Sequence, residues 1–218
     1  HKTFTGRSGT FFGYEGLGSI YWHMVSKLRL AVFEVTKSAL ESEVSTELTS
    51  RLIDHYFQIN LGIGSHKSPD LYGAFPTDPY SHTPGGKGAQ QPGMTGQVKE
   101  DLLCRFGELG VRVNQGSLSF DIDLLTKSEF LTHSAIFNYV DINQNSHRIE
   151  LPANSLAYTI CQVPVIYILG ESPQIQVFMS DGQQEKINGL SLTRELSQKI
   201  FKRTDEVIKI NVTVVYEN

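Results

Sequence analysis

The stretch "VRVNQGSLSFDI", residues 111–122, marks the point at which the sequence changes from helical patterns to strand patterns. Asn114 and Gly116 lie between two short alternating runs, which is the signal of a β-hairpin turn. Four more strand-like runs follow: "AIFNYV" (135–140), "HRIELP" (147–152), "LAYTICQVPVIYIL" (156–169) and "IQVFMS" (175–180). The final run, "EVIKINVTVVYEN" (206–218), also alternates. The sequence therefore predicts a mostly antiparallel, jelly-roll-like β-sandwich over residues 111–218.

Helical patterns lie mainly upstream of this region. Apolar residues recur at steps of three and four over residues 19–40 and again over residues 45–59, and the short connection predicts an antiparallel helical hairpin. A shorter helix is expected after an N-cap at Thr95, and another between Thr193 and about residue 202. The predicted fold class is therefore α+β.

A long segment without periodicity, residues 64–96, separates the helical hairpin from the strands. Loops of this length are usually functional or disordered, and aromatic residues within it favour function. Its amide, imidazole and ammonium side chains are suited to binding sugar hydroxyl groups, and the residues expected to do so are His82, Lys87, Gln90 and Gln91. The alternative is an ordered loop that only covers the junction. The predicted divisions are residues 1–63, 64–110 and 111–218.

A glycine-rich stretch, "TGRSGTFFGYEGLGS" (residues 5–19), precedes the first predicted helix. Free backbone N–H groups at such a turn bind anions or oxygen-rich ligands. Arg7 and Ser8 would add hydrogen-bond donors, and Glu15 would act as an acid or base. The alternative is that the glycines only form tight turns at the helix entry.

Composition excludes several classes of function. With 19 basic and 23 acidic residues and no basic run, nucleic acid is not an expected partner. No apolar stretch is long enough to span a membrane, and no metal-ligand spacing predicts a catalytic metal. "DINQNS" (141–146) begins like a calcium loop, but Ser146 replaces the required glycine and Pro152 the final glutamate. The compartment stays open between cytoplasm and periplasm.

Residues 5–32, "TGRSGTFFGYEGLGSIYWHMVSKLRLAV", resemble the closing part of the (α/α)₆ catalytic barrel in the six-hairpin glycosidase superfamily. The resemblance is nearest to the cellobiose and chitobiose phosphorylases, and it is carried by Thr5, Gly6, Gly9, Phe11, Phe12, Glu15, Gly16, Leu17 and Gly18. It implies an oligosaccharide or polysaccharide substrate, cut by hydrolysis or with inorganic phosphate as co-substrate. It also implies that this turn helps to hold phosphate or lines the sugar site, that upstream helices supply the main catalytic carboxylate, and that a β-domain follows the barrel. Within this chain, Glu15 is the expected catalytic carboxylate.

A barrel of twelve helices needs well over 200 residues, so this chain has room for only one of its helical hairpins. We therefore expect the C-terminal part of a carbohydrate-active enzyme, inactive alone, that pairs with the missing N-terminal part or with a second copy. A non-catalytic carbohydrate-binding or structural β-sandwich is the alternative, and a pure assembly domain is a third.

Overall fold

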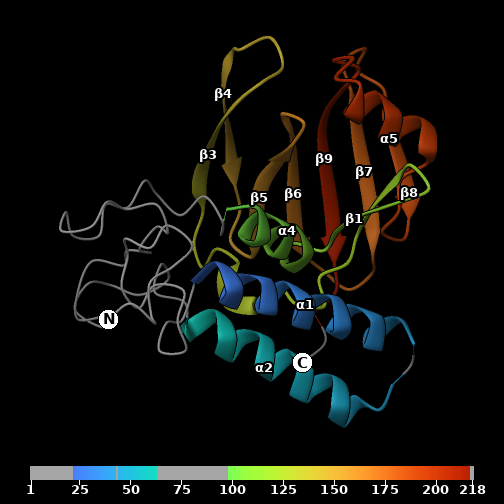
Figure 1. Cartoon of the computed structure of the whole chain (residues 1–218). Coiled ribbons are helices and arrows are strands. Elements are labelled where there is room, and N and C mark those ends of the chain that lie inside the picture. Colours follow the sequence, from blue (N-terminus) through green and yellow to red (C-terminus); the bar gives the residue numbers. More distant parts are fainter. Residues whose placement is uncertain (1–21, 43, 63–97, 217–218) are drawn as a thin grey trace, which may run out of the picture. The chain divides into compact units, whose positions relative to one another are not determined.

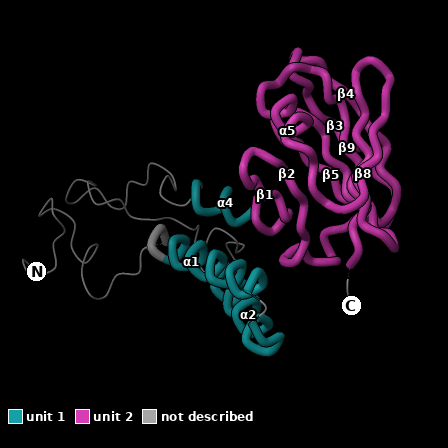
Figure 2. The backbone as a smooth tube through the Cα atoms, turned by 90° about the vertical axis from the view of Figure 1, so that its right-hand side faces the viewer, with its two compact units in different colours: residues 1–105 teal, residues 106–218 magenta. Residues whose placement is uncertain are grey.

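The computed structural model describes residues 22–42, 44–62 and 98–216. These residues form four α-helices and several sheets of mostly antiparallel strands, so the α+β expectation is confirmed (Figure 1). The chain divides into two units, residues 1–105 and 106–218, which are described separately (Figure 2). The finer division at residues 63 and 110 stays a prediction.

The first unit, residues 1–105, contains α1 (Trp22–Glu41), α2 (Thr46–Gly62) and the first part of α4 (Val98–Glu108). A buried arginine connects the three helices: Arg29 donates from Nη2 to Tyr56 Oη at 2.9 Å and from Nη1 to Asp101 Oδ1 at 2.8 Å. The guanidinium also lies 5.2 Å from the centre of the Tyr56 ring. A buried cation is stable only with such partners, so these contacts hold the helices together.

The described residues of the second unit, 106–216, contain nine strands. Five of them form one sheet in the order β5–β6–β9–β7–β8, with bounds Ser155–Ile160, Val163–Leu169, Val207–Val214, Gln174–Met179 and Gln184–Asn188. Strands β6 and β9 are parallel, and every other pair in this sheet is antiparallel. Two further antiparallel pairs are β1–β2 (Val111–Asn114, Ser117–Phe120) and β3–β4 (Ala135–Val140, Ser146–Leu151). A short 3₁₀ helix, η3, spans Lys127–Glu129.

The predicted hairpin turn between β1 and β2 is confirmed, with positive φ angles at Gln115 and Gly116. The expectation of one uninterrupted strand over residues 156–169 is wrong, because the chain reverses at Cys161 and Gln162. Both residues have positive φ, 48° and 70°, which is the geometry of a two-residue hairpin turn. Neither residue is the Asn or Gly that normally signals such a turn.

Helix α5 (Arg194–Phe201) packs against β2 and the central strand β9. Its predicted start after Thr193 is confirmed, and Thr193 Oγ1 caps the helix by accepting a hydrogen bond from the Leu196 amide. Ser197 accepts a hydrogen bond from the Leu118 amide at 2.9 Å and donates one to the Thr193 carbonyl at 2.7 Å. The core lies between α5, the β1–β2 pair and the sheet, and its fully buried members include Leu118, Phe120, Val165, Tyr167, Ile175, Val177, Ile210 and Val212.

Candidate functional site

A cavity of about 430 Å³ opens at one edge of the five-stranded sheet in the second unit. The topology brings distant segments to this edge. Because β6 and β9 are parallel, both begin there, and the antiparallel β7 ends there. The wall is completed by the β3–β4 pair, the Cys161–Gln162 turn, and the end of α5 with the segment after it. The lining residues thus come from five parts of the chain. They are Tyr139, Asp141, Ile142, His147, Ile149, Cys161, Gln162, Val163, Phe178, Lys199, Arg203, Asp205, Val207, Ile208 and Lys209.

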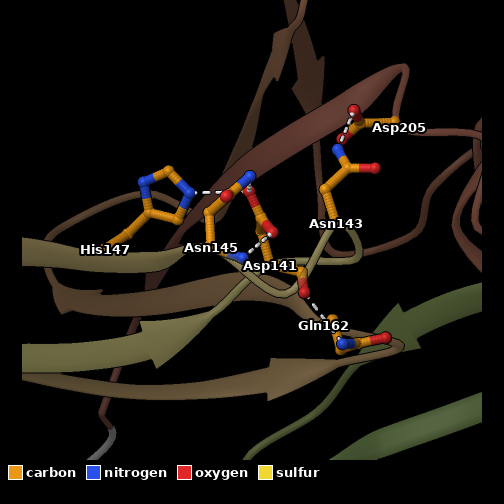
Figure 3. Close-up of polar contacts among 6 residues, drawn as sticks. All are labelled: Asp141, Asn143, Asn145, His147, Gln162 and Asp205. Carbon is orange, nitrogen blue, oxygen red and sulfur yellow. Dashed lines mark hydrogen bonds and ion pairs between the residues drawn. The ribbon is translucent and has the colours of Figure 1, made fainter.

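Asp141 is the centre of the polar network in this cavity (Figure 3). Its carboxylate lies 2.7 Å from His147 Nε2 and also accepts hydrogen bonds from the backbone and the side chain of Asn145. Its carbonyl oxygen accepts a hydrogen bond from Gln162 Nε2 at 2.9 Å. An ionised carboxylate only accepts hydrogen bonds, so His147 Nε2 carries the hydrogen. The network fixes the β3–β4 loop against the β5–β6 turn.

A second contact ties the same loop to the segment after α5. Asn143 Nδ2 donates to Asp205 Oδ2 at 2.8 Å (Figure 3). Residues 62 positions apart in sequence thus meet at the cavity rim. Side chains therefore connect the β3–β4 loop both to the β5–β6 turn and to the segment after α5.

Aromatic rings line the β3–β4 side of the cavity. Tyr139 and His147 are cross-strand partners whose ring centres lie 5.2 Å apart with planes 22° from parallel. Phe137 continues the row, with its ring centre 5.8 Å from that of Tyr139. Across the cavity, Lys209 Nζ lies 4.0 Å from the centre of the Phe178 ring. The cavity thus combines ring surfaces with hydrogen-bonding groups, which is the usual composition of a small-molecule site.

Backbone strain is concentrated at this cavity. Seven non-glycine residues of the described chain have positive φ, and four of them line the cavity: Cys161, Gln162, Arg203 and Asp205. A fifth, Gln144, lies in the Asp141–Asn145 loop. Such conformations cost about 1–3 kcal/mol each and cluster at functional sites, where the fold holds side chains in place. The clustering marks the cavity as the candidate site of this unit.

Local interactions change the pKa values of Asp141 and Tyr139 at the cavity. The hydrogen bond from His147, followed by those from Asn145 and Asn143, lowers the pKa of Asp141 despite partial desolvation. Burial, and secondarily the charge of Asp141, raises the pKa of the Tyr139 hydroxyl. Asp141 therefore stays ionised and Tyr139 stays a hydrogen-bond donor near neutral pH.

The lowered pKa of Asp141 predicts a pH-dependent stability. A carboxyl group whose pKa is lower when folded stabilises the fold above its unfolded pKa, near 3.9, and loses this effect as pH falls through the folded pKa. Asp141→Asn should therefore reduce the free energy of unfolding at pH 7, and the difference from wild type should shrink below about pH 4. Urea unfolding at pH 7, 5, 4 and 3 measures this. A constant difference at all four pH values would contradict the prediction, and Glu171→Gln, an exposed carboxyl change in the same unit, is the control.

The site residues expected from the sequence lie outside the described residues: Glu15, Arg7, Ser8, His82, Lys87, Gln90 and Gln91. Sequence reasoning missed the cavity, although it had singled out the "DINQNS" segment that forms part of it. In the structure Asn145 donates hydrogen bonds to the Asp141 carboxylate, and Asn143 donates one to the Asp205 carboxylate. The carboxylate at the first position of this loop is thus already engaged by protein groups.

Among residues 22–42, 44–62 and 98–216, no group of three or more His, Cys, Asp or Glu side chains has a metal-binding arrangement. No helix within these ranges is both long and apolar enough to cross a membrane. No protein-family model matches the chain, and a search of curated proteins found no match.

Proposed function

We propose that this chain is the C-terminal part of a carbohydrate-active enzyme, a glycoside hydrolase or phosphorylase, and that its second unit binds saccharide at the cavity beside Asp141. Glu15 is the proposed site carboxylate of the parent enzyme, with Arg7 and Ser8 as oxygen-ligand donors and the polar loop as a source of sugar contacts. Glycosidic bonds are cut by paired carboxyl groups, or by one carboxyl group with phosphate as nucleophile. The chain alone binds saccharide without cleaving it.

The observation that carries the proposal is the mixture of ring surfaces and directed polar groups in one cavity. Sugars present C–H faces, which pack on aromatic rings, and hydroxyl groups, which both donate and accept hydrogen bonds. Tyr139 and His147 supply rings, while Gln162 and Asp205 supply amide and carboxylate groups. The volume of about 430 Å³ falls within the range of small-molecule sites.

In the same proposal, α1 and α2 form a helical hairpin at the end of an α/α barrel, and the second unit is a jelly-roll-like sandwich. The exposed apolar side chains of the two helices support the first part. Leu28 and Val35 on α1 are 54% and 55% exposed, and Leu61 on α2 is 72% exposed. Apolar side chains in such number on two adjacent helices favour burial against further helices. The same observation is compatible with an assembly domain.

Saccharide binding is tested by titrating the full chain with a panel of oligosaccharides in isothermal titration calorimetry. We expect binding in the wild type and a loss of affinity of at least about ten-fold, or 1.4 kcal/mol, in Tyr139→Ala, because the ring surface is removed. Tyr216→Ala removes a tyrosine ring outside this cavity and should leave the affinity unchanged. No binding by any member of the panel would refute the proposal for this unit.

The second candidate function is a carbohydrate-binding module without a catalytic role. It is favoured by the location of the cavity, since every lining residue belongs to the second unit. A cleavage assay distinguishes the two candidate functions. Glycosidic cleavage or phosphorolysis by the proposed parent enzyme, lost on Glu15→Gln with saccharide binding retained, supports the enzyme. Binding without any cleavage supports the module.

A further inference from the structure

The charges at the cavity leave two cations available to a ligand. Three cationic side chains line it, Lys199, Arg203 and Lys209, against the carboxylates of Asp141 and Asp205. Lys199 is already held by Glu206, with Nζ and Oε2 2.9 Å apart. The two carboxylates are likewise engaged by His147 and Asn143. The remaining cations are Arg203 and Lys209.

Arg203 is the more informative of the two. No hydrogen bond or ion pair to its guanidinium group comes from the part of the chain that the structure describes. Its backbone has a φ of 53° directly after the helix cap at Lys202, a position at which glycine is strongly favoured. An arginine there carries a conformational cost, and the contacts seen within the fold do not offset it. A ligand that accepts hydrogen bonds from the guanidinium group would offset this cost.

Lys209 approaches the cavity from β9, where its ammonium group covers the Phe178 ring. A cation that rests on an aromatic face keeps its other hydrogen-bond donors free. Arg203 and Lys209 thus supply two cationic groups that form no ion pair with the described residues, at a site that also offers the Tyr139 ring for sugar packing. With Lys199 paired to Glu206, the carboxylates of Asp141 and Asp205 balance these two charges only while no ligand is bound. This is the arrangement expected for a sugar that carries its own negative charge.

We propose that the cavity binds an anionic sugar, whose carboxylate or phosphate group is bonded by Arg203 and Lys209 while the sugar ring packs beside Tyr139. This inference rests on the proposed saccharide binding and narrows its ligand class. A uronate supplies a carboxylate and a sugar phosphate supplies a phosphate. Both match the planar donor fork of arginine, so the experiment must tell them apart.

The test measures the affinity of the full chain for glucose, glucuronate, glucose 6-phosphate and inorganic phosphate at constant ionic strength. We expect one or both anionic sugars to bind at least ten-fold more tightly than glucose and inorganic phosphate. The tighter of the two identifies the anionic group. Arg203→Gln and Lys209→Gln should each abolish most of this preference. Arg148→Gln should not, because Arg148 lies on β4 between His147 and Ile149, which line the cavity, and does not itself line it.

Arg203→Gly separates a binding role from a structural one. Glycine adopts positive φ freely, so this variant should melt at a higher temperature than the wild type while it loses the preference for anionic sugars. A lower melting temperature with the preference intact would show that Arg203 serves the fold, and would overturn the proposal. Equal affinity for glucose and both anionic sugars would also overturn it, but would leave saccharide binding standing. Inorganic phosphate binding as tightly as the sugars would mean that only an anion is recognised. No binding of any sugar would refute both proposals.

Discussion

Gly110→Ala is expected to prevent the second unit from folding stably, with a loss of more than about 4 kcal/mol in the free energy of unfolding. A Cβ atom at this position would lie 1.8 Å from the Asp121 carbonyl oxygen and 2.2 Å from the Asp121 carbonyl carbon. Both are backbone atoms that a rotamer change cannot move. The Asp121 amide also donates to the Gly110 carbonyl at 2.8 Å, so separating the two segments would break this hydrogen bond. Circular dichroism during urea or thermal unfolding measures the effect.

The matched control is Gly182→Ala. Gly182 has a positive φ of 87°, close to the 70° of Gly110, but a Cβ atom there would have no atom within 4 Å. This variant should therefore show only the conformational cost of alanine at positive φ, about 1–2 kcal/mol. If the two variants lost equal stability, the close approach to Asp121 would not be the cause of the Gly110 effect.

Tyr167→Ala is expected to cost about 3–5 kcal/mol, the usual loss when a buried aromatic side chain is removed from a core. Tyr167 is fully buried on β6, and its ring meets those of Phe120 and Tyr158 edge to face, with centres 6.0 and 5.4 Å away. Its hydroxyl donates to the Leu109 carbonyl and accepts from the Tyr158 hydroxyl. Burial raises the pKa of this hydroxyl and outweighs the hydrogen bond from Tyr158, which lowers it. The hydroxyl therefore remains a hydrogen-bond donor at all ordinary pH values.

Tyr167→Phe divides this loss between packing and hydrogen bonding. The phenylalanine keeps the ring contacts but leaves the buried Leu109 carbonyl without its donor, which should cost about 1–3 kcal/mol. Urea unfolding of the wild type and both variants gives the two contributions. A phenylalanine variant as stable as the wild type would mean that water reaches the Leu109 carbonyl.

Local signals in the sequence were sufficient to predict several elements of the fold. The β1–β2 turn was identifiable because Gly116 follows Asn114 and Gln115 between two alternating runs. Helix α5 was identifiable because Thr193 is a good N-cap residue, and its side chain does bond to the Leu196 amide. In both places the residue types and the required backbone geometry agree, so no tertiary information is needed.

The β5–β6 turn could not be predicted in this way. Cys161 and Gln162 are poor residues for positive φ, and the surrounding apolar run reads as one strand. The Gln162 side chain donates to the Asp141 carbonyl, 21 residues earlier in the sequence. That contact exists only in the folded unit, so tertiary structure overrides the local preference of these residues.

The candidate site was unpredictable for a related reason. Its polar groups are spread over residues 139–209, and their proximity depends on which strand ends share an edge of the sheet. Asp141 and His147 could have been paired from sequence, because a hairpin with a short loop places them side by side. Arg203 and Lys209 could not be assigned to the same site as Tyr139, because their presence in one cavity depends on the parallel β6–β9 pairing.

The position of β9 between β6 and β7 also determines when the sheet can form during synthesis of the chain. Strand β9 is the last of the five strands to leave the ribosome, yet it occupies the middle of the sheet, between β6 and β7. Until residues 207–214 are synthesised, β6 and β7 each have an unpaired edge, and such edges are sites of aggregation. The five-stranded sheet therefore cannot form until its last strand has been synthesised. A polypeptide stalled before residue 207 would have to be kept from aggregating by other factors.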